Sequence, residues 1–315
     1  MKICIYGAGA VGGNFAARLA NAGHDVCVVA RGATLAAIRE RGITIESGDE
    51  RIVARVAASE RPADLGPQDV VVSTLKASGL PALASGLGPL LGPDTSIVFA
   101  QNGIPWWYGL QPGAPDLSLL DPGGLLARSV EARRIVAGVV YSANTVVAPG
   151  VIRNAPPNRI VVAHIDDTQS ALLDALRQAF ADAGIASPPA DSICREIWQK
   201  LASNLVTGMT ILVDEPTSAM MADPHMRAVA ARLVDETAAI AAAFGISVQK
   251  SLPSVPPGKK ASILVDYEDK RTMEVEAQFL APLAFARAAG IAAPTLEAVA
   301  ATIAHKAAAQ GSFTR

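Results

Sequence analysis

The chain has 315 residues, half of them hydrophobic, and a formal net charge of −2. This length is too great for one comfortable core and predicts two domains. The charge is close to neutral and no run of Lys or Arg exceeds two residues, which argues against binding to nucleic acid or an anionic membrane surface. No apolar stretch approaches the roughly 20 residues needed to span a bilayer.

The first residues read as a β-strand and not as a charged segment before an apolar one, so we expect no secretion signal. Cys4, Cys27 and Cys194 are too widely spread for a metal-binding pattern. These features predict a reduced, cytoplasmic protein that holds no metal and binds neither nucleic acid nor membrane.

The opening of the chain reads as strand, glycine turn, helix and second strand. Its parts are Met1–Tyr6, which is apolar without helical period, Gly7–Gly12, the helical stretch Asn14–Ala22 and the apolar run Val26–Ala30. Glycines spaced as GxGxxG inside such a βαβ unit indicate a dinucleotide-binding fold, although a plain glycine turn is the alternative. Amide groups at the start of the helix would face the cofactor's phosphates. The predicted cofactor-binding residues here are Gly7, Ala8, Gly9, Ala10, Val11 and Gly12.

Arg31 stands at the end of the second strand, where an NAD-binding fold usually carries Asp or Glu. Asp25 lies at the wrong end of that strand. A guanidinium suits the 2′-phosphate of NADP, so the sequence favours NADP(H), with a solvated arginine as the alternative.

Strands and helices continue to alternate up to Gly184. We expect helices at Thr34–Arg41 and Thr168–Ala183 and a helix interrupted by glycines at Leu80–Leu91. We also expect a hairpin at Ile43–Glu46 and Ile52–Ala57, and strands at Asp69–Leu75, Thr95–Ala100, Ile135–Tyr141, Val151–Arg153 and Arg159–Ala163. Lys76 and Asn102, like Arg31, follow strand ends. Parallel strands bring ligand-binding residues to their carboxyl ends, so these three side chains should line one crevice.

Residues 105–134 read as a long loop that begins with the aromatic run Pro105–Tyr108 in a chain with few aromatic residues. A long loop within a compact domain is usually functional or disordered. The aromatic side chains could cover the cofactor or gate a substrate pocket. Equally, they could pin a surface loop or form a subunit contact.

After Pro189 the strand patterns stop. Expected helices are Asp191–Val213, Asp223–Phe244, Ala261–Asp269, Met273–Ala289 and Pro294–Gln310. The fold class is therefore α/β, with an N-terminal Rossmann-like dinucleotide-binding domain (residues 1–188) and an all-helical substrate and catalytic domain (residues 189–315). Apolar faces in the second domain make a homodimer plausible.

Lys200 and Asn204 lie one helical turn apart and share a face of the first of these helices. A reductase that adds hydride to a ketone needs a proton donor and a cation beside the developing alkoxide, and a lysine can be both. A solvated surface lysine is the alternative.

Several short motifs in this order resemble the ketopantoate reductase (2-dehydropantoate 2-reductase) family over nearly the whole chain. They are Gly7, Gly9 and Gly12, Arg31, Thr74–Lys76, Gln101–Gly103, Trp198–Asn204, Ser262 with Asp266, and Arg271 with Glu274. The resemblance implies NADPH-dependent reduction of 2-dehydropantoate to pantoate, in pantothenate biosynthesis. It implies that Lys200 is the proton donor and that Asn102, Asn204 and Ser262 bind the 2-oxo acid. It also implies that Lys76, Asn102 and Glu274 bind the cofactor.

Some positions depart from the family pattern. Gly208 and Lys259 stand where the family commonly has asparagines, and Phe279–Leu280 stands in place of Asn-Gly. The hypothesis that follows is a different 2-oxo acid substrate, because Gly208 would leave room for a bulkier or more apolar substituent. Other readings are a hydroxyacid or polyol-phosphate dehydrogenase of the same architecture and a non-catalytic NADP-sensing protein.

Overall fold

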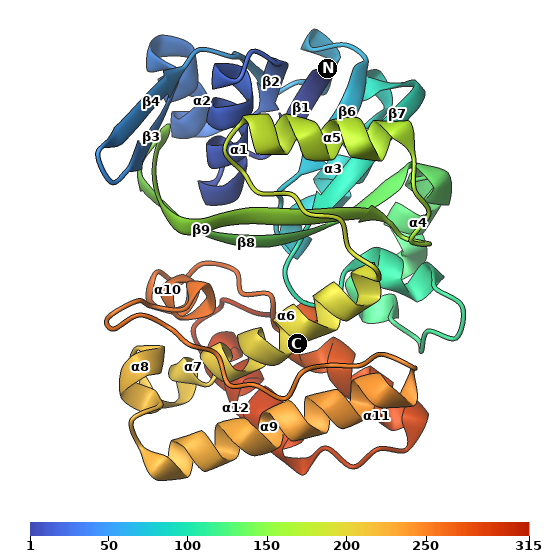
Figure 1. Ribbon diagram of the computed structural model, residues 1–315, viewed down its shortest axis with the longest axis vertical. Helices are drawn as coiled ribbons and strands as arrows, with labels where there is room; N and C mark the ends of the chain where they lie inside the picture. Colours follow the sequence, from blue (N-terminus) through green and yellow to red (C-terminus); the bar gives the residue numbers. More distant parts are fainter. Residues whose placement is uncertain (315) are drawn as a thin grey trace. The chain divides into compact units, whose positions relative to one another are not determined.

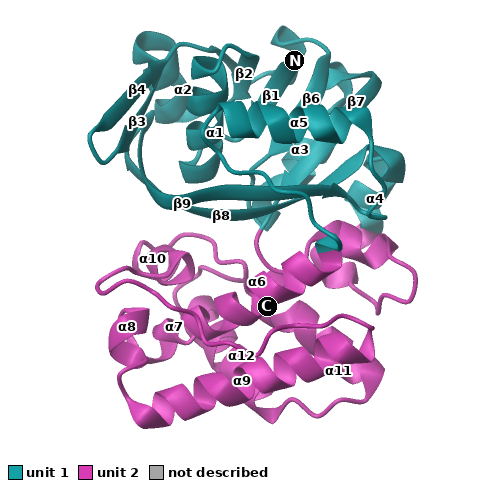
Figure 2. Cartoon of the chain, in the orientation of Figure 1, with its two compact units in different colours: residues 1–101, 124–193 teal, residues 102–123, 194–315 magenta. Residues whose placement is uncertain are grey.

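A computed structural model describes residues 1–314. The chain divides into two compact units, coloured separately in Figure 2. Unit 1 comprises residues 1–101 and 124–193, and unit 2 comprises residues 102–123 and 194–315. Residues 102–123 lie within the predicted first domain, yet they pack with the helical unit because their aromatic side chains are buried there.

Unit 1 is built on a sheet that has nine strands within the described residues. The strands are β1 (Lys2–Tyr6), β2 (Asp25–Val29), β3 (Ile43–Ser47), β4 (Glu50–Ala54), β5 (Ala57–Ser59), β6 (Gln68–Ser73), β7 (Leu91–Ala100), β8 (Ile135–Ala148) and β9 (Val151–His164). Their order is β4-β3-β9-β8-β7-β6-β1-β2-β5. The run from β8 to β5 is parallel, whereas β3–β4 and β8–β9 are antiparallel hairpins. The parallel run confirms the predicted Rossmann-like fold.

Helices cover this sheet. They are α1 (Ala10–Asn21), α2 (Gly32–Arg41), α3 (Leu80–Gly86), α4 (Leu125–Ser129) and α5 (Ala171–Asp182). Helices α1 and α5 lie side by side (Figure 1), and the ring of Phe15 meets that of Phe180 edge-on at 5.3 Å. Both rings are fully buried, and a buried side chain of this size contributes about 1.5–3 kcal/mol.

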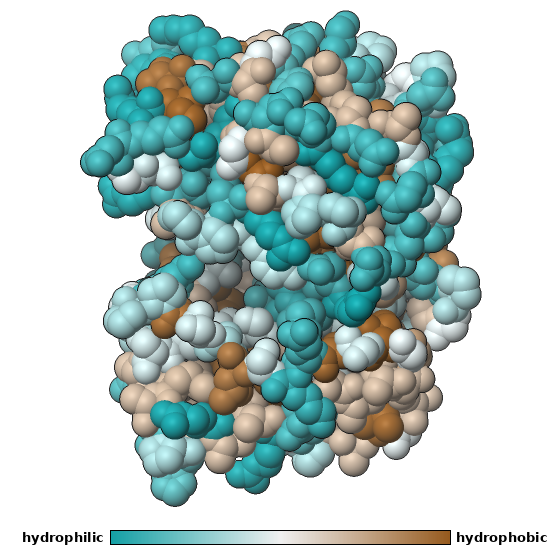
Figure 3. All heavy atoms as spheres, in the orientation of Figure 1, coloured by the Kyte–Doolittle hydropathy of each residue, from teal (hydrophilic) through white to brown (hydrophobic). Residues whose placement is uncertain are grey.

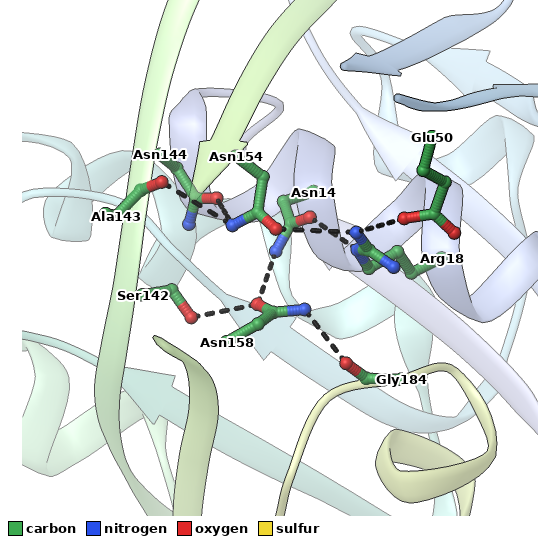
Figure 4. Close-up of polar contacts among 9 residues, drawn as sticks. All are labelled: Asn14, Arg18, Glu50, Ser142, Ala143, Asn144, Asn154, Asn158 and Gly184. Carbon is green, nitrogen blue, oxygen red and sulfur yellow. Dashed lines mark hydrogen bonds and ion pairs between the residues drawn. The ribbon is translucent and has the colours of Figure 1, made fainter. Parts of the chain in front are cut away.

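A partly buried polar network joins α1 to the sheet (Figure 4). Arg18 donates from Nε to Oδ1 of Asn14 (3.0 Å) and from a terminal guanidinium nitrogen to Oε2 of Glu50 (2.9 Å). Asn14 in turn donates from Nδ2 to Oδ1 of Asn158 on β9 (3.0 Å), and the hydroxyl of Ser142 on β8 donates to the same oxygen (3.0 Å). The helix that begins at the glycine turn is thereby fixed against the β8–β9 hairpin and β4.

Two predictions for unit 1 are corrected. The three late strands are two strands of 14 residues each, because pairing between β8 and β9 continues across Pro156–Pro157 with a register shift after Ser142. The helix expected at Leu80–Leu91 ends at Gly86, and β7 already begins at Leu91, since Gly88 and Pro89 interrupt helical hydrogen bonding.

Unit 2 is helical within the described residues, as predicted. Its helices are α6 (Ile193–Gly208), α7 (Thr210–Val213), α8 (Thr217–Met220), α9 (Pro224–Ala243), α10 (Ser262–Glu268), the π-helical segment η8 (Glu276–Leu280), α11 (Ala281–Ala289) and α12 (Pro294–Ala309). Asp223 caps α9 by accepting from the amides of His225 (2.8 Å) and Met226 (2.9 Å). The single helix expected over Asp191–Val213 is broken at Met209.

The segment expected as a long loop is also different. Residues 106–110 form a short 3₁₀ helix, and Trp106, Trp107 and Tyr108 are buried. On the face drawn in Figure 3, polar side chains predominate and apolar ones occur in separate groups. Over residues 1–314, every helix is too short or too polar to traverse a bilayer.

Candidate active site

The turn between β1 and α1 has the glycine geometry that a dinucleotide requires. Gly7 has φ +105°, a region that other residues adopt only with strain. A Cβ on Gly12 would lie 1.9 Å from the carbonyl oxygen of Gly7, so only glycine lets the helix approach the turn. The hydroxyl of Thr74 donates to that same oxygen at 2.7 Å. This hydrogen bond therefore links the turn to the end of β6.

The start of α1 is open to a ligand. Gly9 is its N-cap, and within residues 1–314 no atom would lie within 4 Å of a Cβ added there. Ala10 and Val11 form the first turn, whose amide groups have no partner within the helix. This arrangement fits the pyrophosphate of a dinucleotide, since amide dipoles at a helix start favour negative charge.

Arg31 and Lys76 lie where parallel strands of unit 1 end. Arg31 is exposed, and its backbone is the N-cap of α2. Burial raises the pKa of Tyr6 at the end of β1, and the charge of Arg31 opposes that rise, which indicates that the two groups are neighbours. Lys76 is half-buried at the start of the 3₁₀ turn Ala77–Gly79.

In unit 2, Lys200 lies beside two other residues that the sequence predicts for the site. Its Nζ donates to Oδ1 of Asn102 at 2.6 Å, although the two residues are 98 positions apart. Burial lowers the pKa of Lys200 from 10.5 to about 8, and the negative charge of Glu274 partly opposes this. Glu274 is itself buried, with 8% of its surface exposed. The structure thus brings together three residues that the sequence predicts for the site.

The position of Asn102 is set by the residues that follow it. Gly103 has φ +75°, and a Cβ there would lie 2.5 Å from the carbonyl oxygen of Ala277. The amide of Ile104 donates to that oxygen at 2.8 Å. The backbone after Asn102 is therefore in close contact with η8, and this close approach requires glycine at position 103. Because Asn102 belongs to unit 2 and Arg31 and Lys76 to unit 1, their shared crevice stays a prediction.

Asn204 and Gly208 follow Lys200 on the same face of α6, one and two turns further on. The expectation that Gly208 leaves free room is wrong. A Cβ on Gly208 would lie 2.5 Å from Cζ of Phe279, whose fully buried ring fills this space. Two of the departures from the family pattern, Gly208 and Phe279, are thus one packed pair, contributed by α6 and η8.

Ser262 is exposed at the first position of α10. Asp266, one turn later, forms an ion pair with Nε of Arg271 at 3.1 Å. These contacts account for Asp266 as a local structural residue, and the role of Ser262 in the site stays a prediction.

Sequence reasoning did not predict that Tyr108 and Trp198 meet. The indole Nε1 of Trp198 donates to the hydroxyl oxygen of Tyr108 at 3.0 Å inside a buried aromatic cluster. The sequence marked each residue separately, Tyr108 by the aromatic run Pro105–Tyr108 and Trp198 by the motif Trp198–Asn204, and neither pattern indicates their pairing.

Comparison with known proteins agrees with this architecture. Residues 3–167 match the family profile described as ketopantoate reductase PanE/ApbA, and residues 192–307 match its C-terminal counterpart. A protein of Mesorhizobium japonicum named 2-dehydropantoate 2-reductase is 36% identical over 100% of both chains. These matches support a dinucleotide-binding oxidoreductase.

Solved structures show the same fold. A structure described as a putative ketopantoate reductase from Ralstonia solanacearum has a TM-score of 0.88, with 30% identity over 99% of both chains. D-mandelate dehydrogenase, solved with NADH and anilino(oxo)acetate, has a TM-score of 0.85 at 18% identity, covering 99% of this chain and 100% of that one. The latter likeness concerns the fold alone. On the profile matches and the full-length 36% identity, the chain belongs to the ketopantoate reductase family.

Proposed function

We propose that this protein reduces 2-dehydropantoate to pantoate with NADPH and that Lys200 is the proton donor. The observation that carries the proposal is the half-buried ammonium of Lys200, which is hydrogen-bonded to Asn102 and has its pKa lowered to about 8. Relatives named 2-dehydropantoate 2-reductase supply the reaction class.

NADPH supplies the hydride that reaches the 2-oxo carbon. As the carbonyl oxygen gains negative charge, Nζ of Lys200 stabilises it and then transfers a proton, so the products are the 2-hydroxy acid and NADP⁺. With a pKa of about 8, Lys200 is protonated in roughly 90% of molecules at pH 7, and the amine recovers its proton readily from water. Asn102 orients the ammonium, and we assign Asn204 and Ser262 to the substrate's polar groups.

The preference for NADPH over NADH rests on Arg31. Arg31 is exposed and is the N-cap of α2, so a 2′-phosphate bound there would meet both a full positive charge and helix amide groups. The other cofactor contacts we propose are the Gly7–Gly12 turn for the pyrophosphate, Lys76, Asn102 and Glu274. The fold does not choose between the cofactors, because D-mandelate dehydrogenase was solved with NADH.

The test is the loss of NADPH absorbance with ketopantoate, compared between wild type and Lys200→Ala. We expect turnover with NADPH, little with NADH, and a fall in kcat of about 10²–10⁴-fold in the variant, which is the usual contribution of a positioned acid. Lys250→Ala is the matched control, since Lys250 forms an exposed ion pair with Asp235 (2.9 Å) in the same unit. Undiminished kcat in Lys200→Ala would reject Lys200 as the donor.

A different 2-oxo acid is the second candidate substrate. The Gly208–Phe279 pair supports it, because this pair puts an aromatic ring and no amide beside the face of Lys200 and Asn204. Measurement of kcat/KM over 2-oxo acids with polar and apolar substituents separates the candidates. A clear preference for ketopantoate would exclude the second one. Binding of NADPH without turnover of any acid would instead favour a sensor.

A further inference from the structure

The segment from Asn102 to Tyr108 contacts helix α6 at two places. Lys200 donates to Asn102 at 2.6 Å, and Trp198 donates to Tyr108 at 3.0 Å. Residues 198 and 200 project roughly 200° apart around the axis of an α-helix. The segment therefore bonds to nearly opposite sides of α6, which restrains rotation of the helix about its own axis.

The contact at Tyr108 lies in a buried cluster of aromatic rings. Trp198 is 0% exposed and Tyr108 is 4% exposed. The Tyr108 ring stacks on Trp107 (centroids 5.9 Å apart) and meets Phe285 of α11 edge-on at 5.3 Å. Phe285 also meets the ring of Trp198, at 5.1 Å. The ring of Phe285 thus packs against both partners of the hydrogen bond, Tyr108 and Trp198, and restrains the geometry of that bond.

The contact at Asn102 is equally constrained. Ile104 donates to Ala277, and Gly103 lies against the same carbonyl, as described above. The segment is consequently anchored to η8 and α11 on one side and to α6 on the other. A change in the seating of α6 would alter the distance from Lys200 to Asn102, because the backbone that follows Asn102 is held against η8 and not against α6.

We propose that Tyr108 is a positioning residue, whose hydroxyl fixes α6 through Trp198 and so holds Lys200 in register with Asn102. The inference rests on the proposed role of Lys200 as proton donor. Without the hydroxyl, the buried indole N–H of Trp198 loses its hydrogen-bond partner, which costs about 1–3 kcal/mol. The helix then has reason to shift and admit water, which would restore the ordinary proton affinity of the Lys200 amine.

The test is Tyr108→Phe in the full chain, with a readout that does not require turnover. The rate at which an amine-directed acylating reagent modifies Lys200 is followed against pH by peptide mass spectrometry. In wild type the rate should rise with a midpoint near the lowered pKa of about 8. Desolvation is the main cause of the lowered pKa of Lys200. If the variant admits water to this amine, we expect the midpoint to move upward by about half a pH unit or more.

Kinetics provide the second readout. We expect Tyr108→Phe to lower kcat about 3–10-fold and to shift the pH profile of kcat in the same direction, since the geometry of a catalytic group changes while cofactor contacts do not. Trp198→Phe removes the same bond from its other end, and the double variant should be no worse than the more affected single variant. If Tyr108→Phe folds poorly, Trp198→Phe alone still tests the role of this hydrogen bond.

Thr237→Val is the control, because it removes another buried hydroxyl bond of unit 2, from Thr237 to the carbonyl of Leu233 (2.7 Å) on α9. If Tyr108→Phe and Trp198→Phe lower Tm yet leave the labelling midpoint and the pH profile at wild-type values, the proposal is overturned. If Lys200→Ala retains activity, the proposed function fails instead, and the labelling midpoint still tests the link between Tyr108 and Lys200.

Discussion

At the scale of single residues, the decisive feature is the environment of Lys200. A lysine on a helix usually keeps its charge in water. Here burial lowers the pKa of the ammonium to about 8, and Asn102 accepts its hydrogen bond. The group is thus still protonated near neutral pH but gives up its proton easily, which is the property that a general acid needs.

This environment predicts the pH dependence of reduction. The acid form of Lys200 is lost as pH rises through about 8, so kcat for ketopantoate reduction should fall about tenfold for each further pH unit. Oxidation of pantoate by NADP⁺ needs the neutral amine and should rise over the same range. Steady-state rates from pH 6 to pH 10 in both directions check this. A flat profile for reduction through pH 9 would contradict it.

The same lowered pKa predicts how the free energy of unfolding changes with pH. The unfolded chain holds the lysine proton up to about pH 10.5, whereas the folded chain releases it near 8. Between these values the unfolded state binds more protons, so the contribution of Lys200 to the free energy of unfolding increases with pH. Below pH 8 the buried charge opposes folding.

At the scale of elements, α6 and η8 are fitted to each other at Gly208 and Phe279. Alanine in place of glycine within a helix normally stabilises by about 0.5–1 kcal/mol. At Gly208 the added Cβ would come within 2.5 Å of the Phe279 ring, so this gain is outweighed. We expect Gly208→Ala to lower the free energy of unfolding by about 1–3 kcal/mol.

Urea unfolding measures the change, and a second substitution tests its cause. Phe279→Leu shortens the side chain that meets the new methyl group, so Gly208→Ala with Phe279→Leu should be more stable than the sum of the single effects predicts. Strict additivity would show that the loss in Gly208→Ala has another origin.

The glycine turn and the polar network of α1 act at the same scale. The network through Asn14, Arg18 and Asn158 fixes the helix whose first amide groups would face the pyrophosphate. The sequence predicts the turn because its glycine spacing is local. It does not predict the network, because the partners of α1 come from β4, β8 and β9.

At the scale of the whole molecule, cofactor binding should be visible as stability. A ligand that binds only the folded state at 100 times its Kd stabilises by about 2.7 kcal/mol. We expect NADPH to raise Tm by several degrees and NADH at the same concentration to raise it less, because the proposed contact of Arg31 with a 2′-phosphate is possible only with NADPH.

Arg31→Ala should remove most of the difference between the two cofactors, whereas Arg39→Ala, a change on the same helix, should preserve it. Arg39 is bonded to the carbonyl of Ala58 (3.1 Å) and lies in the last turn of α2. Thermal unfolding with each cofactor checks this. Equal stabilisation of wild type by NADPH and NADH would contradict the assignment of Arg31.

The sequence alone determined the architecture and the family. The βαβ opening, the parallel strands and the helical second half follow from hydrophobic period and glycine spacing, which act over a few residues. Membership of the ketopantoate reductase family, expected from motifs in order along the chain, is confirmed by matches over nearly its full length.

The tertiary structure decided what each motif residue contacts. Lys200 meets Asn102 across 98 positions and Trp198 meets Tyr108 across 90, and no local pattern records such distances. The grouping of residues 102–123 with unit 2, the ring of Phe279 over Gly208 and the lowered pKa of Lys200 have the same origin. Packing between distant segments sets the solvation of a side chain, and solvation determines whether a helical lysine is a surface charge or an acid.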